Sequence, residues 1–291
     1  MAWQSKSDLV YIKLKGKKVV PNQNIPSDTE VIAPWFSDHQ KPHGAIEVRA
    51  HILDDDKLSH LEDFFSRAIP DCYISQADLE ERVNVTGLSA SEILQNKIPD
   101  TGSVMAGDFG EILTLFYLAS ERSESIKKLK KWRFKQDRRK AAPHSDVVIL
   151  YRERTDRATD NDFVICAESK VKSTNSDSRP IEMSIKGYTS DKTGRLARTL
   201  VWLKEKAIDH KNPEEITYIE RFTDGHLNTA FKKNYKAVAV IDRAFLDEEI
   251  TKTLTLPPQS EEFEVIVIGI NNLKVLYEHS FSRALSEVTC G

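Results

Sequence analysis

The chain has 291 residues, of which 40% are hydrophobic and 30% charged, and its formal net charge is −3. This composition is typical of a globular protein with enough apolar residues for a substantial core. No stretch approaches the roughly 20 apolar residues that a membrane helix needs, and residues 1–18 carry charges where a signal peptide has an apolar segment. We therefore expect a cytoplasmic protein with no membrane segment.

The basic residues are distributed unevenly along the chain. Residues 127–140 contain nine Lys or Arg and one acidic residue, Asp137, a local net charge of +8; subtracted from −3, this leaves −11 for the remainder. A concentrated basic segment on an acidic body favours local contact with phosphate groups over general coating of nucleic acid. A solvated helix face explains such a run equally well.

The first part of the chain predicts a mixed α/β region. Apolar residues alternate with lysines over 9–20, as in an exposed strand, and 46–53 is a second strand candidate. Apolar residues then repeat at helical spacing from Leu58 to Phe65. This region offers no visible site, which makes it a candidate surface for docking a partner.

A domain boundary is predicted within 96–103, where Pro and Gly interrupt the pattern. It separates an N-terminal α/β region, 1–100, from a second domain, 101–291. The patterns beyond it predict a helix, two strands, a second helix and two further strands: 105–119, 147–151, 163–167, 192–207, 237–242 and 263–270. The predicted fold class is therefore α/β, a sheet flanked by helices.

The central strand pair predicts a hairpin that brings charged residues together. Its polar connection, 152–162, is centred on residue 157, which is also the midpoint of Asp146 and Glu168. An antiparallel pair of this length places Asp146 directly opposite Glu168. Because side chains alternate along a strand, Glu168 and Lys170 share one face while Ser169 points to the other.

Two opposed carboxylates with a neighbouring lysine predict an oxygen-ligand site for a hard cation. Mg²⁺, or Mn²⁺ in its place, favours one or two carboxylates and accepts phosphate oxygens. Hydrolysis of a phosphodiester needs an activated water and positive charge near the phosphorus oxygens. We therefore interpret Asp146 and Glu168 as metal ligands and Lys170 as a catalytic residue, with Glu111 reaching in from the preceding helix. A surface salt bridge on a sheet edge is the alternative.

Several basic residues are candidates for contact with nucleic acid: Arg138, Arg139, Lys140, His144, Lys172 and Arg195. Those in the run precede the strand of Asp146, so they are positioned to meet a substrate backbone entering the site. His144 lies two residues before Asp146, and Lys172 shares the strand face of Lys170. For His144 and Arg195, an ordinary loop or solvated position remains an alternative.

At these residues the chain resembles the PD-(D/E)XK nuclease superfamily. It resembles more closely the HamA family, the nuclease component of the bacterial Hachiman antiphage system, through the segments Gly107–Glu111, Pro143–Asp146 and Glu168–Lys170. The resemblance implies a restriction-endonuclease-like mixed sheet, cleavage of DNA during phage infection and a helicase partner, HamB. Pro143 departs from the nominal motif, in which the proline adjoins the aspartate.

Two other functions are compatible with the sequence. The chain would be a non-catalytic DNA-binding or adaptor subunit if the nuclease fold were vestigial, or a restriction endonuclease that acts without a partner. The residues by themselves leave DNA and RNA open as substrates. The chain has no Gly-rich phosphate loop of the Walker type, so any ATP-driven motor must be a partner.

Overall fold

The computed structural model describes residues 30–289 apart from short segments: 41–47, 123–124, 224–229, 253–255, 259 and 261. In this described part of the chain, seven strands form one mixed sheet. In chain order they are β1 Phe36–Asp38, β2 Arg49–Leu53, β3 Lys127–Lys128, β4 Val147–Tyr151, β5 Phe163–Lys172, β6 Lys232–Asp242 and β7 Phe263–Ile270. The strand predicted over 9–20 lies outside the described residues.

The spatial order of the strands is β1-β2-β7-β6-β5-β4-β3. The four central strands β2, β7, β6 and β5 run parallel, and β1, β4 and β3 are antiparallel to their neighbours. Residues 237–241 of β6 and most of β7 are apolar and buried, as expected where helices cover both faces of a sheet. The predicted α/β class with a mixed sheet is confirmed.

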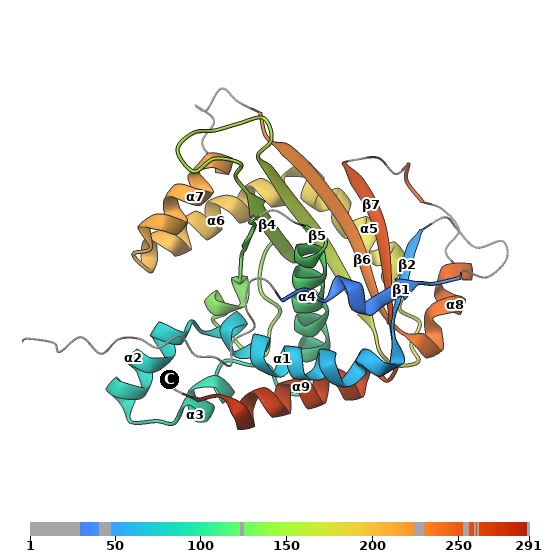
Figure 1. Cartoon of the computed structure of the whole chain (residues 1–291), viewed down its shortest axis with the longest axis horizontal. Coiled ribbons are helices and arrows are strands. Elements are labelled where there is room, and N and C mark those ends of the chain that lie inside the picture. The colour runs from blue at the N-terminus through green and yellow to red at the C-terminus, as the bar shows by residue number, and fades with distance from the viewer. Residues whose placement is uncertain are drawn as a thin grey trace, which may run out of the picture.

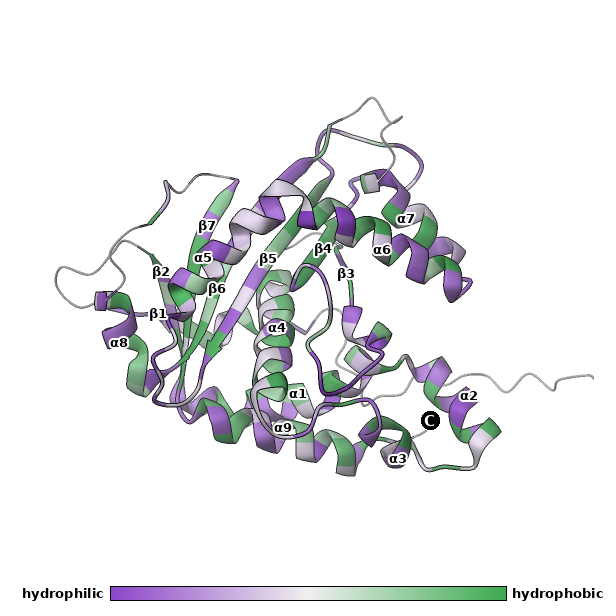
Figure 2. Ribbon diagram, turned by 180° about the vertical axis from the view of Figure 1, so that it is seen from behind, coloured by the Kyte–Doolittle hydropathy of each residue, from purple (hydrophilic) through white to green (hydrophobic). Residues whose placement is uncertain are grey.

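Helices cover both faces of this sheet (Figure 1). One layer contains α1, α4 and α9, and the opposite layer contains α5, α6, α7 and α8. Viewed from behind, apolar residues line the strands between the two layers (Figure 2). The helices are α1 Leu58–Tyr73, α2 Gln76–Thr86, α3 Ala90–Gln95, α4 Ser103–Ser120, α5 Pro180–Ser190, α6 Leu196–Asp209, α7 Pro213–Thr223, α8 Arg243–Lys252 and α9 Leu273–Glu287.

The N-terminal part of the chain joins the same sheet as the remainder. Strand β2 pairs in parallel with β7, and α1 packs along α9. Residues from both sides of the boundary predicted near 100 therefore share one sheet and one core. A docking role for 1–100 stays a prediction. Among the described residues, no helix is long and apolar enough to cross a membrane.

The hairpin of β4 and β5 has the predicted register. Val147 pairs with Ala167 and Tyr151 with Phe163, so the connection is centred on residue 157. The sequence alternation also holds, because Ala167 faces the α1–α4–α9 layer while Cys166 faces the α5–α8 layer. The even-numbered charged residues of β5 consequently lie on the α5–α8 side of the sheet.

The helix predicted over 192–207 is only partly correct. Helix α6 begins at Leu196, because Gly194 has φ 125° and interrupts the helical backbone just before it. A residue without Cβ adopts this conformation at little cost. The preceding helix, α5, was not predicted, because few of its residues are apolar and buried. The break directs Asp191 and Arg195 toward β5, as described below.

Candidate active site

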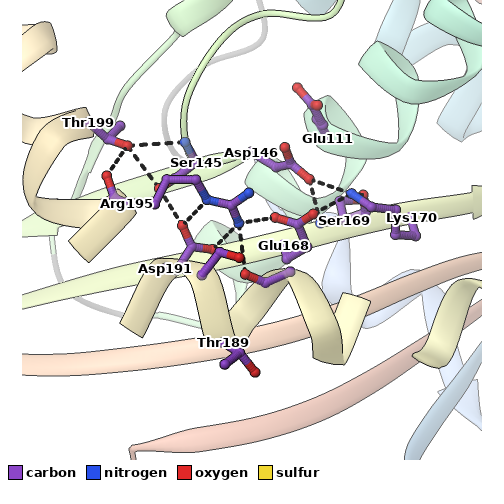
Figure 3. Close-up of polar contacts among 12 residues, drawn as sticks. Glu111, Ser145, Asp146, Glu168, Ser169, Lys170, Thr189, Asp191, Arg195 and Thr199 are labelled. Atoms are coloured by element: carbon purple, nitrogen blue, oxygen red, sulfur yellow. Dashed lines mark hydrogen bonds and ion pairs between the residues drawn. The ribbon is translucent and has the colours of Figure 1, made fainter. Parts of the chain in front are cut away.

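Asp146, Glu168 and Lys170 form one contact cluster at the junction of β4 and β5. Lys170 Nζ lies 3.1 Å from Asp146 Oδ2 and 2.5 Å from Glu168 Oε1. Asp146 Oδ2 also accepts a hydrogen bond from the Ser169 amide at 3.0 Å. The lysine thus bridges two carboxylates, one on β5 and one immediately before β4 (Figure 3).

The environment gives the two carboxylates different pKa values. Burial opposes ionisation of Asp146, but Lys131, Lys170 and the Ser169 amide outweigh it and lower the pKa. Burial and the charge of Asp146 raise the pKa of Glu168, only partly offset by Lys170. Asp146 is therefore the more firmly ionised member of the pair. Burial opposes the charge of Lys170, yet its two acidic neighbours raise its pKa, so it stays protonated.

Helix α4 brings Glu111 to the cluster from the other side of the sheet. The close approach of α4 to β5 depends on Gly110, where a Cβ would overlap the Val171 side chain. Glu111 Oε2 accepts a hydrogen bond from Trp132 Nε1 at 2.9 Å. Burial raises the pKa of Glu111 to about 8. Figure 3 shows Glu111 on the helix near Asp146, with no direct contact drawn between them.

Lys131 is a member of the site that the sequence did not single out. Its Nζ lies 3.3 Å from Glu111 Oε2 and 3.8 Å from Asp146 Oδ1. In the sequence it is one of nine basic residues in a run, and nothing local separates it from its neighbours. The fold of residues 131–134 into a 3-10 helix places its side chain in the interior.

Arg195 lies on the opposite side of Glu168 from Lys170 (Figure 3). Its Nη2 donates to Glu168 Oε2 and, at 2.9 Å, to the carbonyl oxygen of Gly187. Its Nε donates to Asp191 Oδ1 at 2.7 Å, and the same Asp191 oxygen accepts from Ser145 Oγ at 2.6 Å. Arg195 was predicted to contact nucleic acid, and the structure places it against a candidate metal ligand.

The remaining candidates for contact with nucleic acid differ in their accessibility. Arg139 and Lys140 are exposed, whereas Arg138 is bound to Asp100 Oδ1 at 2.5 Å. His144 has φ 74° and lies against Trp202, with ring centroids 4.8 Å apart. Burial and the positive charges of Lys131 and Arg198 lower the His144 pKa.

Lys172, a candidate for contact with nucleic acid on the strand face of Lys170, is buried. It is 6% exposed, and its Nζ lies 2.7 Å from Glu249 Oε1 of α8 and donates to the Ser178 carbonyl oxygen at 3.1 Å. The alternation rule gives the face of the sheet correctly, but it does not show that α8 covers that face beyond Lys170. Contact with nucleic acid would require this buried ion pair to open.

Most of the basic run is engaged in contacts within the molecule. Lys130 and Arg133 contact Asp71, and Lys135 Nζ lies 2.6 Å from Asp108 Oδ2. These pairs fix the 3-10 helix to α1 and α4. The run therefore serves partly as the internal counter-charge of buried carboxylates.

A cleft of about 570 Å³ gives access to the cluster. Its lining includes Glu111, Asp146 and Lys170, together with residues at the start of α4 and of α9. Such a concave opening beside charged groups with shifted pKa values is a general property of functional sites. The cleft makes Lys170 accessible from outside the molecule.

The carboxylates of the site are the kind of ligand that a hard divalent cation binds, but lysine and arginine side chains already contact them. Asp146, Glu168 and Glu111 supply carboxylate oxygens, which suit Mg²⁺ or Mn²⁺. Within the described ranges, no three acidic, histidine or cysteine side chains converge as a metal-binding group. Asp146 and Glu168 fit a two-carboxylate site, with Lys170 between them.

The fold and the cluster define a class of protein: an α/β protein whose mixed sheet carries a Glu-x-Lys pair on β5, with an Asp immediately before the neighbouring strand β4. The HamA family model matches residues 30–284. The chain belongs to the HamA family, and membership associates it with the Hachiman defence system. No curated protein sequence matches the chain.

Proposed function

We propose that the chain is a divalent-metal-dependent nuclease that hydrolyses DNA phosphodiester bonds. We further propose that it acts as the effector of a Hachiman complex with a helicase partner. The observation that carries the proposal is the contact of Lys170 with both Asp146 and Glu168 at the wall of a cleft. HamA family membership supports the biological setting, and the partner and the DNA substrate follow from the resemblance.

Each residue of the cluster has a chemical role in this proposal. Asp146 and Glu168 hold Mg²⁺ or Mn²⁺, with Glu111 as a further ligand or water anchor. When bound, the metal supplies an acidified water and positive charge for the phosphate oxygens. Lys170 orients the attacking water and stabilises the negative charge that develops on the phosphate, because its ammonium is protonated and adjoins the cleft.

The site residues are tested by replacing Glu168 and Lys170 together with Ala. We expect Mg²⁺- or Mn²⁺-dependent cleavage of DNA to be abolished, both for the chain alone and with the proposed helicase partner. The control is the double variant Asp209→Ala, Lys211→Ala, which removes another acid-x-Lys triplet at the exposed end of α6. Cleavage retained by the Glu168/Lys170 variant would refute the site.

A second candidate function is a DNA-binding adaptor without catalysis. It is favoured by the charge balance of the cluster, in which Lys131, Lys170 and Arg195 contact the three candidate ligands. This candidate predicts that the purified complex binds DNA with equal affinity in EDTA and in Mn²⁺ and never cuts it. Cleavage that requires metal and Glu168 excludes the adaptor.

A further inference from the structure

Lys131 occupies the space between two carboxylates of the candidate site. Its ammonium lies within 4 Å of Glu111 and Asp146 and donates to the Ser145 carbonyl oxygen at 2.9 Å. The residue is only 3% exposed, so its charge is little screened by water. A buried positive charge thus faces the same oxygens that would bind a metal.

The protein holds this ammonium in a fixed place. Lys131 begins a 3-10 helix whose next residue, Trp132, is buried and bonded to Glu111. The same segment is anchored to α1 through Arg133 and Asp71, whose side chains are 2.6 Å apart, and to α4 through Lys135. Moving Lys131 away from Asp146 therefore requires its long side chain to rearrange within a packed environment.

Lys131 and a divalent cation would both neutralise the negative charge of the buried carboxylates. Without a positive charge between them, two buried carboxylates repel each other, and one of them takes up a proton or another cation. Because like charges repel, a metal that binds Asp146 and Glu168 is opposed by a lysine 3.8 Å from Asp146 Oδ1. Lys131 also contacts Oε2 of Glu111, the same oxygen that accepts the hydrogen bond from Trp132, so a metal at this oxygen would compete with the lysine.

We propose that Lys131 is the resident counter-cation of the Glu111–Asp146 pair and sets the affinity of the candidate site for a divalent metal. The inference rests on the proposed metal-dependent function and concerns how strongly that same site binds its metal.

The experiment measures metal binding rather than cleavage. MnCl₂ and MgCl₂ are titrated by calorimetry into the full chain without nucleic acid, for the wild type, Lys131→Met and Lys131→Gln. Removal of the charge is expected to tighten Mn²⁺ binding by at least about tenfold. Addition of Mn²⁺ should also raise the melting temperature of these variants more than that of the wild type.

Two control variants isolate the position and the charge. Lys135→Met removes another buried lysine of the same segment, one whose Nζ lies 2.6 Å from Asp108 instead of the Glu111–Asp146 pair. Lys131→Arg keeps a positive charge at the site. Both are expected to bind Mn²⁺ with about the wild-type affinity.

The outcomes decide between the inference and the proposed function. Unchanged or undetectable Mn²⁺ binding in folded Lys131→Met and Lys131→Gln overturns the role of Lys131. If Lys131→Met fails to fold, Lys131→Gln, which keeps a donor for the Ser145 carbonyl, answers the question. The proposed nuclease function fails separately, when the wild type with its partner shows no metal-dependent cleavage.

Discussion

Gly187 of α5 lies directly against the side chain of Glu168 on β5. A Cβ at position 187 would overlap the Cδ and Oε1 atoms of Glu168. The carbonyl oxygen of Gly187 also accepts a hydrogen bond from Arg195, which in turn contacts Glu168. The absence of a side chain at one helix position therefore creates the space that the candidate ligand fills.

Replacing Gly187 with Ala should lower DNA cleavage even though Ala has the higher helix propensity. Ala favours the helical state by roughly 1 kcal/mol over Gly in an open position, but here the added methyl group displaces Glu168. We expect DNA cleavage to fall about 100-fold, since a shift of this size misplaces a reacting group. The measurement is the single-turnover cleavage rate together with urea unfolding. Met183→Ala, at an exposed position of the same helix, should leave the rate unchanged.

Arg195→Lys tests whether the guanidinium positions Glu168. An ammonium cannot contact Glu168, Asp191 and the Gly187 carbonyl oxygen together, as the fork of Arg195 does. We expect cleavage to fall by about 10- to 100-fold and the free energy of unfolding by about 1–3 kcal/mol. Arg198→Lys, on the exposed side of α6, is the matched control. Equal cleavage by both variants would contradict the positioning role.

The ion pair of Asp162 and Arg221 predicts an acid-sensitive contribution to stability. The carboxylate is buried at the start of β5, and Arg221 Nε lies 2.5 Å from its Oδ2. Burial opposes ionisation, but Arg221 and backbone amides of Thr159 and Glu153 lower the pKa of Asp162 below its ordinary value of 3.8. Because the folded-state pKa is the lower one, the stabilisation is present above the unfolded-state pKa and is lost as the pH falls toward the folded-state pKa.

Asp162→Asn tests this contribution far along β5 from the candidate site. At pH 7 we expect the free energy of unfolding to fall by about 2–4 kcal/mol, because Arg221 keeps its charge and loses the carboxylate. The difference between wild type and variant should shrink as the pH is lowered from about 5 to about 3. Urea unfolding across this range measures it, and a constant difference would show that the charge of Asp162 plays no part.

Lys172→Met distinguishes a structural lysine from a nucleic-acid contact. Breaking the buried pair with Glu249 should cost about 3–5 kcal/mol of stability without weakening DNA binding by the folded fraction. The double variant Lys172→Met, Glu249→Leu should recover part of that loss, because the buried carboxylate that Lys172 neutralises is removed together with the lysine. Arg139→Ala removes an exposed charge and should leave stability unchanged within about 0.5 kcal/mol. A selective loss of DNA affinity in Lys172→Met would restore the sequence-based prediction.

The hairpin was predictable from the sequence for a local reason. Strand alternation and the length of the connection depend on neighbouring residues alone, so they placed Asp146 opposite Glu168 and put Lys170 on the same face. The nearly continuous apolar runs of β4 and β7 were likewise recognisable, since both faces of these strands are buried. Helix α5 was not predicted, because it has few apolar positions and follows polar residues.

The sequence by itself thus determined the candidate carboxylates, their lysine and, by resemblance, the family. Only the tertiary structure decided which basic residues stay exposed and which serve the site. Lys131, Arg195 and Gly187 are joined to Glu111 and Glu168 by contacts between residues distant in the chain. Such contacts depend on how helices pack on the sheet, and no local periodicity encodes them. The basic run of 127–140 looked like one surface in the sequence, yet folding divided it into buried counter-ions and exposed charges.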